Sequence, residues 1–345
     1  MTTTQAQRVT HVDVLAAPSR TGAVASSALR RHAPLAAAVA FTVGLLVLSV
    51  VTGVADITDT AGTGGDFLWI TRVPRTIALV LAGASMATAG LIMQLLTQNR
   101  FVEPSTVGTA EWAGLGLLLV YIFFPQSNLA TKMLVAIAFG FIGTMIFFAF
   151  LKRVQLRSSL IVPIVGIMFG AVVSAVATFL AIRFNLLQTL GTWFAGRFTG
   201  IESGRYEALW IVLIVCVAAV VLADRFTVAG LGKEVATNVG LHYERVVFLG
   251  VSLVAVATGV VAVVVGMLPF LGLIVPNLVS LVRGDNLRTN IPWVFLTGIC
   301  VVTICDLIGR TIIAPFEVPV SLVLGAVGSV IFIGLLLRTR RAGVS

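Results

Sequence analysis

Ten long apolar runs, separated by short polar segments, set the strongest limit on what this chain can fold into. The runs cover residues 35–54, 76–97, 105–124, 131–151, 159–182, 206–223, 244–266, 270–283, 291–309 and 318–337. A helix that crosses the ~30 Å hydrocarbon core of a bilayer needs about 20 apolar residues, and most of the runs are that long. Charged residues form 11% of the chain, against roughly 25% in soluble domains. The sequence therefore excludes a water-soluble enzyme and predicts an all-α polytopic membrane protein with about ten transmembrane helices.

The positions of the basic residues predict the orientation of these helices. With the N-terminus inside the cell, all but seven of the 23 Lys and Arg residues fall in inside segments, which is the bias of the positive-inside rule. The seven on the outside are Arg72, Arg75, Lys132, Arg183, Arg197, Arg205 and Arg310. An even number of spans then places both termini in the cytoplasm. We expect a polar N-terminal tail at 1–34, a transmembrane domain at 35–337 and a C-terminal tail at 338–345.

The residue patterns that support catalysis are missing from the sequence. The string from Gly230 to Glu234 has Glu after Lys233, where a phosphate-binding loop needs Ser or Thr to hold magnesium. Cysteines occur only within apolar runs, and the three histidines are scattered through polar stretches, so no metal-ligand spacing exists. The sequence predicts a protein that is not an enzyme. Uphill transport would take its energy from a partner or from an ion gradient.

Asp306 is the clearest ionisable residue within an apolar run, and Arg310 follows it four residues later. This spacing places a carboxylate and a guanidinium on one helix face, which lowers the cost of burying both. Two interpretations remain open: the pair fixes helix packing, or Arg310 serves the external mouth of a pathway.

Arg72 and Arg75 flank Pro74 at the outer start of the second span, against the positive-inside rule. Snorkelling of the two side chains to the membrane interface is one explanation. Docking of acidic groups from an external partner is the other, because arginine binds carboxylates through two parallel hydrogen bonds.

The inside loop at about 228–245 predicts a short helix between Gly232 and Gly240, with the two glycines as its start and stop. Val235 and Val239 stand four residues apart and so share one side of that helix. A short amphipathic helix of this kind can insert into a groove of a soluble partner.

Strings at 72–76, 90–108, 231–241, 270–277 and 306–320 follow one another in a recognisable order. They include Arg-Val-Pro-Arg-Thr from Arg72, Leu-Gly-Lys-Glu from Leu231 and Phe-Leu-Gly-Leu from Phe270. The set resembles the signature of FecCD-type permeases of ABC importers, the group that includes the cobalamin and iron–siderophore permeases. Arg100 and Asn277 depart from the family pattern, which has proline and, more often, histidine at these places.

The resemblance implies the type II ABC importer permease fold, with ten helices in each of two paired permease subunits. A cytoplasmic ABC ATPase would bind beneath each subunit, and an external substrate-binding protein would deliver the ligand. The resemblance implies that the chain itself binds no cofactor, metal or nucleic acid. The ATP would be used by the partner ATPase subunit. It would lie in the cytoplasmic (inner or plasma) membrane of a prokaryote, in contact with lipid.

Functional residues of the family fall on three groups of positions in this sequence. The groups are Gly232, Glu234, Ala236 and Gly240 for ATPase coupling; Arg72, Arg75 and Arg310 for docking of the binding protein; and Ser158 and Ser159 for a cytoplasmic gate. The stretch 186–200, which contains Trp193, resembles the family's short outer helix.

Asn277, followed by the segment 284–287, resembles the ferric-siderophore subgroup of the family. The sequence therefore favours a ferric siderophore as the transported substrate. A permease for cobalamin or haem, and an ion-coupled secondary transporter, remain as alternatives.

Overall fold

The computed structural model describes residues 20–53, 68–153, 161–284 and 286–342, and these residues are nearly all helical. The chain divides into two compact units, 1–40 and 41–345. The described part of the first unit is the beginning of α1 (Arg20–Val51), and all other elements belong to the second unit. Among the described residues, β-structure is limited to an isolated bridge between Ile313 and Phe316.

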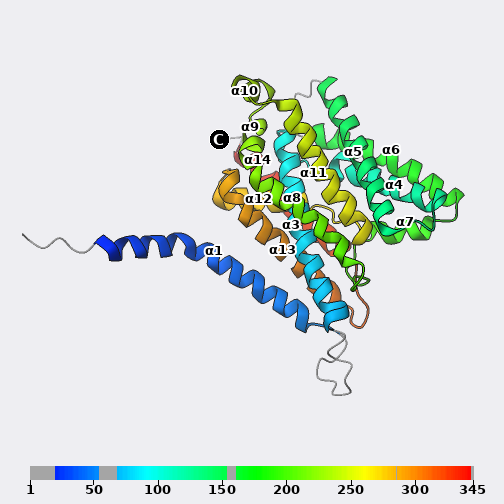
Figure 1. Cartoon of the computed structure of the whole chain (residues 1–345), viewed down its shortest axis with the longest axis horizontal. Helices are drawn as coiled ribbons and strands as arrows, with labels where there is room; N and C mark the ends of the chain where they lie inside the picture. The colour runs from blue at the N-terminus through cyan, green and yellow to red at the C-terminus, as the bar shows by residue number, and fades with distance from the viewer. Residues whose placement is uncertain (1–19, 54–67, 154–160, 285, 343–345) are drawn as a thin grey trace, which may run out of the picture. The chain divides into compact units, whose positions relative to one another are not determined.

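The helices follow one another along the chain as labelled in Figure 1. After α1 come η1 (Leu68–Arg72), α3 (Val73–Leu96), η2 (Ser105–Val107), α4 (Thr109–Phe123), α5 (Leu129–Arg153), α6 (Ile161–Arg183), α7 (Leu187–Phe194), η3 (Tyr206–Ile211), α8 (Val212–Val221), α9 (Ala223–Gly230), α10 (Lys233–Asn238), α11 (Tyr243–Val264), α12 (Leu271–Arg283), α13 (Leu287–Thr311) and α14 (Val320–Ala342).

Each predicted apolar run contains a helix, which confirms the all-α membrane architecture. In the described residues, six helices are long and apolar enough to cross a membrane, and a seventh crossing forms if η3–α8 and α9, bent by 67°, count as one span. Three shorter apolar helices lie at Thr109–Phe123, Leu271–Arg283 and Val320–Gly334. The exact number of spans stays a prediction.

α1 begins at Arg20, so the helix starts within the segment 1–34 predicted as a polar N-terminal tail, and the bounds of that tail stay a prediction. The alanines that precede and follow Pro34 favour helix, and proline is accommodated within this long apolar helix.

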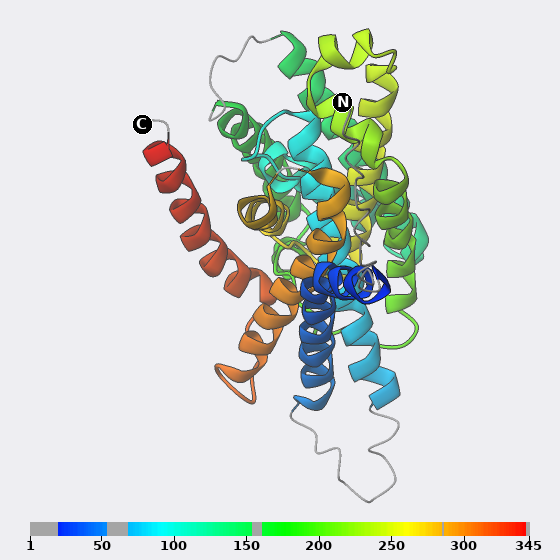
Figure 2. The ribbon, with the colours of Figure 1, turned by 90° about the vertical axis from the view of Figure 1, so that its left-hand side faces the viewer.

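α3 is the central helix of the bundle and lies in the middle of it in both views (Figures 1 and 2). It packs against α8, α9, α11, α12 and α13. Most of its length is buried, including Leu79, Met93 and the run from Ala82 to Gly90. Small residues dominate that run, so neighbouring helix backbones can approach closely, as is typical of packing in membranes.

Two glycine pairs mark the closest approaches to α3. A Cβ atom placed on Gly83 would lie 2.8 Å from the carbonyl oxygen of Gly298 on α13, and one on Gly90 would lie 2.0 Å from the carbonyl oxygen of Gly272 on α12. Backbone atoms cannot move aside as the end of a flexible side chain can. Glycine is therefore required at these crossings because any side chain would collide with the neighbouring backbone, and not because the backbone conformation excludes other residues.

Gly90→Ala is expected to destabilise the protein by about 1–3 kcal/mol, because the new methyl group overpacks the crossing of α3 and α12. Gly325→Ala on α14 is the matched control, since nothing lies within 4 Å of the added Cβ and alanine favours helix. Thermal unfolding of the full-length protein in detergent measures the change in stability that each substitution causes. Equal effects of the two substitutions would contradict the packing argument.

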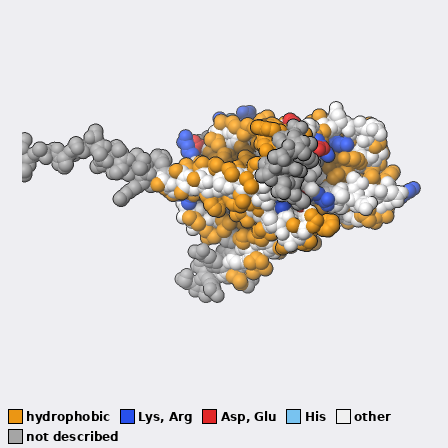
Figure 3. Space-filling view, turned by 90° about the horizontal axis from the view of Figure 1, so that it is seen from below, with side chains coloured by type: hydrophobic (Ala, Val, Ile, Leu, Met, Phe, Trp, Pro, Cys, Tyr) orange, Lys and Arg blue, Asp and Glu red, His pale blue; other side chains and the backbone are white. Residues whose placement is uncertain are grey.

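Apolar side chains also cover the surface of the bundle. Figure 3 shows hydrophobic atoms spread widely over the face in view. Exposed large residues include Leu134 on α5, Met168 and Phe179 on α6, and Ile214 on α8. A surface of this kind is stable against lipid or against another apolar protein surface rather than against water.

Candidate functional site

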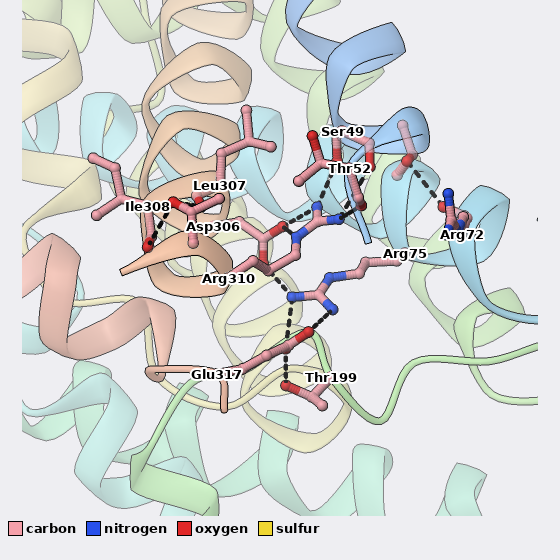
Figure 4. A network of polar contacts seen from close by, with 12 residues as sticks. Ser49, Thr52, Arg72, Arg75, Thr199, Asp306, Leu307, Ile308, Arg310 and Glu317 are labelled. Atoms are coloured by element: carbon pink, nitrogen blue, oxygen red, sulfur yellow. Dashed lines mark hydrogen bonds and ion pairs between the residues drawn. The ribbon is translucent and has the colours of Figure 1, made fainter. Parts of the chain in front are cut away.

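Two arginines and two carboxylates form a cluster, here named the outer charge network: Arg75, Asp306, Arg310 and Glu317 (Figure 4). The Arg75 Nη2 atom lies 2.7 Å from Asp306 Oδ1. The same guanidinium donates two hydrogen bonds of 2.9 Å to the two carboxylate oxygens of Glu317. Arg310 pairs with the other oxygen of Asp306 through Nε and Nη2. The network thus has equal numbers of positive and negative groups.

Three separate segments place these side chains together. Pro74 lies at the start of α3, where its fixed φ suits the first helical turn, and Arg75 follows it in that turn. Asp306 and Arg310 lie one turn apart on α13, and Glu317 lies between α13 and α14. A cation at a helix N-terminus is electrostatically unfavourable. The negative charges of Asp306 and Glu317 offset this cost for Arg75.

The end of α1 completes the surroundings of Arg310. Its Nη1 atom donates to the carbonyl oxygens of Ser49 and Thr52, each at 3.0 Å, and Nη2 donates to Ser49 Oγ at 2.6 Å. The side chain of Arg310 is 7% exposed and that of Asp306 is 0% exposed. Burial of a charge is tolerated only with pairing and full hydrogen bonding, and both conditions are met here.

Glu317 is the most accessible acid of the network, with 22% of its side chain exposed. Burial raises the pKa of this carboxyl, but hydrogen bonds from Arg75 and Thr199 and the charge of Arg75 outweigh it, so the pKa lies below its usual value. Glu317 is therefore ionised at neutral pH. Thr199 Oγ1 donates to it at 2.6 Å, which ties the segment after α7 to the same end of the bundle.

The predicted pairing of Asp306 with Arg310 is confirmed. The further contacts of Asp306 with Arg75 and of Arg310 with Ser49 hold α13 against α3 and α1. Arg72 donates to the carbonyl oxygens of Val50 and Val51, at the C-terminal end of α1. The three arginines predicted to dock a binding protein thus lie at one end of the bundle, but each contacts acceptors of its own chain. Docking stays a prediction for all three.

The opposite end of the bundle carries the predicted short helix, now seen as α10 (Lys233–Asn238). Gly232 and Gly240 flank it with φ of +107° and +87°, values that favour glycine. Ala236 is fully buried and seats α10 on the bundle, whereas Leu231, Val235 and Val239 are 62%, 44% and 71% exposed. The prediction of a short helix with apolar residues on one accessible side is confirmed.

Two exposed ion pairs share Glu244: one joins α10 to α11 and the other joins α5 to α11. Glu244, at the start of α11, lies 2.6 Å from Lys152 on α5 and 3.1 Å from Lys233 on α10. Such exposed pairs add little stability, but the Lys233 pair links α10 directly to α11. Glu234 is exposed beside Val235, and its role in coupling stays a prediction.

Ser158 and Ser159, predicted as the gate, lie outside the described residues. The short outer helix predicted within 186–200 is present as α7 (Leu187–Phe194), whose Trp193 ring lies 4.5 Å from that of Tyr121. In the part of the chain that the structure describes, no three His, Cys, Asp or Glu side chains are grouped to hold a metal. The expected absence of a resident metal stays a prediction.

Glu103 is a structurally important residue that the sequence reasoning missed. Its carboxylate is buried and accepts hydrogen bonds from the backbone N–H groups of Phe270 at 2.9 Å and Leu273 at 3.1 Å, and from the Ser105 hydroxyl. It therefore caps the N-terminus of α12, where a negative charge is favourable. An isolated carboxylate next to Pro104, between two apolar runs, is the signal that could have found it.

The structure is that of a multi-pass helical membrane protein with a polar network at one end and the short, exposed helix α10 at the other. Residues 36–338 match the family model described as the FecCD transport family. The chain belongs to this family, whose members are permease subunits of bacterial ABC importers, and it is accordingly a multi-pass protein of the inner membrane.

Three similar proteins agree with this assignment. The petrobactin import system permease protein FatD of Bacillus anthracis is 56% identical over 89% of this chain and 92% of its own length. The petrobactin import system permease protein YclN of Bacillus subtilis is 42% identical, with 86% and 95% covered. A solved metal-chelate type ABC transporter in an inward-facing conformation shares the fold with a TM-score of 0.75, at 21% identity, over 88% of this chain and 98% of the other.

Proposed function

We propose that this chain is the permease subunit that carries a ferric siderophore across the cytoplasmic membrane, driven by ATP that a separate ABC ATPase subunit hydrolyses. The observation that carries the proposal is the 56% identity to a petrobactin import permease along nearly the whole of both chains. A second petrobactin permease at 42% identity supports the same substrate class. The transported chelate is thus of the petrobactin type rather than cobalamin or haem.

The ATPase is proposed to bind at α10. Gly232 and Gly240 supply the turns that project this helix, and the buried Ala236 fixes it to the bundle. Glu234 and the exposed apolar side chains are then the groups that meet the ATPase. Movement of the ATPase would reach the long helices through Glu244 and its two lysine partners.

An external substrate-binding protein is proposed to dock at the end of the bundle that holds the outer charge network, through Arg75 and Arg310 of the network and through the nearby Arg72. Arg75 presents both of its terminal nitrogens to Glu317. An incoming carboxylate must therefore take the place of Glu317, which its partial exposure permits. Docking would be an exchange of carboxylates at Arg75 rather than the capture of an unpaired guanidinium.

A second permease subunit, identical or related, is proposed to complete the pathway. Exposed apolar residues on α6, among them Ile164, Met168 and Phe179, support contact with another apolar surface. The gate proposed at Ser158 and Ser159 precedes this same helix.

Uptake of ⁵⁵Fe-petrobactin by a strain that lacks the gene tests the substrate. We expect uptake to be lost and to return with the wild-type gene, while cobalamin uptake is unchanged. Unimpaired ⁵⁵Fe-petrobactin uptake in the deletion strain would overturn the proposed substrate.

Proteoliposomes that contain the assembled importer test the energy source. We expect uptake to require ATP on the ATPase side and to continue after the ion gradients are collapsed. Loss of uptake on collapse of the gradients would favour an ion-coupled carrier.

A further inference from the structure

A cavity of about 500 Å³ lies at the same end of the bundle as the outer charge network, and neither the network nor α10 uses it. Its walls come from the end of α4, the start of α5, α7, the segment 195–205 and the end of α11. Thr199, within that segment, donates to Glu317, so the cavity and the network share one end. This is the end that the distribution of basic residues predicts to face outward.

Three cationic side chains belong to the cavity wall: Lys132, Arg197 and Arg205. No carboxylate is part of the wall, and none of these three cations forms an ion pair with a carboxylate among the described residues. Both arginines are exposed, and the Lys132 ammonium lies 4.2 Å from the centre of the Tyr121 ring. The charge of the cavity therefore suits an anion.

The rest of the wall combines backbone and Thr192 with aromatic and apolar side chains. The ring of Trp193 packs against that of Tyr121, with 4.5 Å between the ring centres. Leu117 and Leu129 line the cavity as well. Trp, Tyr and Lys at the ends of apolar helices are typical of the membrane–water interface. A ligand matched to this wall has an anionic group next to an apolar body.

An apolar groove of about 470 Å³ lies on the element that follows Arg205. It runs along η3 and α8, past Trp210, Ile214, Val217 and Val221, which are 48% to 74% exposed. η3 (Tyr206–Ile211) starts directly after Arg205, so consecutive elements carry the cationic rim and the apolar groove. A hydrocarbon chain is the occupant that such a groove favours in a bilayer.

We propose that the cavity binds the headgroup of an anionic phospholipid of the outer leaflet of the cytoplasmic membrane. The phosphate pairs with Lys132, Arg197 and Arg205, and an acyl chain covers apolar surface such as the groove on α8. A single carboxylate of a protein partner needs one exposed arginine and would leave most of a 500 Å³ cavity unfilled. The inference does not rest on which chelate is transported.

Native mass spectrometry of the full-length permease tests the proposal with two lipids that have the same acyl chains, phosphatidylglycerol and phosphatidylcholine. We expect wild-type protein to retain phosphatidylglycerol about tenfold better, since basic residues near a membrane surface attract anionic lipid. The triple variant K132Q/R197Q/R205Q should lose this preference. Arg183→Gln is the matched control, because Arg183 is exposed at the end of α6 and is not part of the cavity wall.

Three outcomes would overturn the lipid site: equal retention of both lipids by the wild-type protein, an unchanged preference in the triple variant, or the same loss in Arg183→Gln. Soluble glycerol phosphate, added in excess, should not displace the lipid, because it lacks the acyl chains. If the triple variant instead keeps its lipid and loses affinity for the purified binding protein, the cavity is a protein-docking site. Circular dichroism and thermal unfolding of the variants separate loss of the site from loss of the fold.

Discussion

Replacement of Val235 and Val239 by lysine is expected to abolish ATP-driven uptake while leaving the permease folded and inserted. Both side chains are exposed on one flank of α10, so neither holds the bundle together. In the proposed interface they would enter an apolar groove of the ATPase, where a lysine must bury its charge or be excluded. Two apolar anchors of an interface contribute about 2 kcal/mol each, so we expect uptake and co-purification of the ATPase to fall by about 100-fold or more.

Thr237→Lys is the control for this double variant. Thr237 is also exposed on α10, but it lies on the other flank, one turn from Lys233. The Thr237→Lys substitution adds one of the two positive charges of the double variant to the same short helix, and we expect uptake within about twofold of wild type. Glu234→Arg, on the exposed side between the flanks, should lose coupling as well. Wild-type uptake by the double valine variant would exclude α10 as the coupling element.

The fold was predictable where a feature is local in the sequence. The length of each apolar run defines a helix, and the pair of glycines at 232 and 240 defines α10, because both effects act within a few residues. The contact of Asp306 with Arg310 is equally local, since i,i+4 spacing on a helix brings the two groups together.

Contacts between distant segments could not be predicted in this way. Arg75 and Asp306 are 231 positions apart, and Glu103 and Phe270 are 167 apart. Nothing near Glu103 indicates which helix N-terminus it caps, and nothing near Arg75 indicates two internal carboxylates. The sequence shows that a charge in an apolar setting needs a partner. Which residue becomes that partner is determined by how the helices pack.

Asp306→Ala is expected to cause the largest loss of stability among single substitutions in the outer charge network, about 3–5 kcal/mol. The carboxylate is 0% exposed and accepts from both Arg75 and Arg310. Its removal leaves Arg310 buried with only carbonyl and hydroxyl acceptors from α1, and leaves Arg75 with Glu317 alone. Thermal unfolding of the full-length protein in detergent measures the effect, with Glu317→Gln as the milder comparison because Glu317 is partly exposed.

The double variant D306L/R310L separates the penalty of an unpaired charge from the loss of a favourable contact. Replacing a whole buried ion pair with apolar side chains of similar size is often close to neutral, whereas removing one partner is costly. Arg75 keeps Glu317 in the double variant, so no buried guanidinium is left without a carboxylate. We therefore expect the double variant to be more stable than Asp306→Ala. A double variant that is less stable than the single one would mean that the pair itself, and not the avoidance of an unpaired charge, stabilises the outer end.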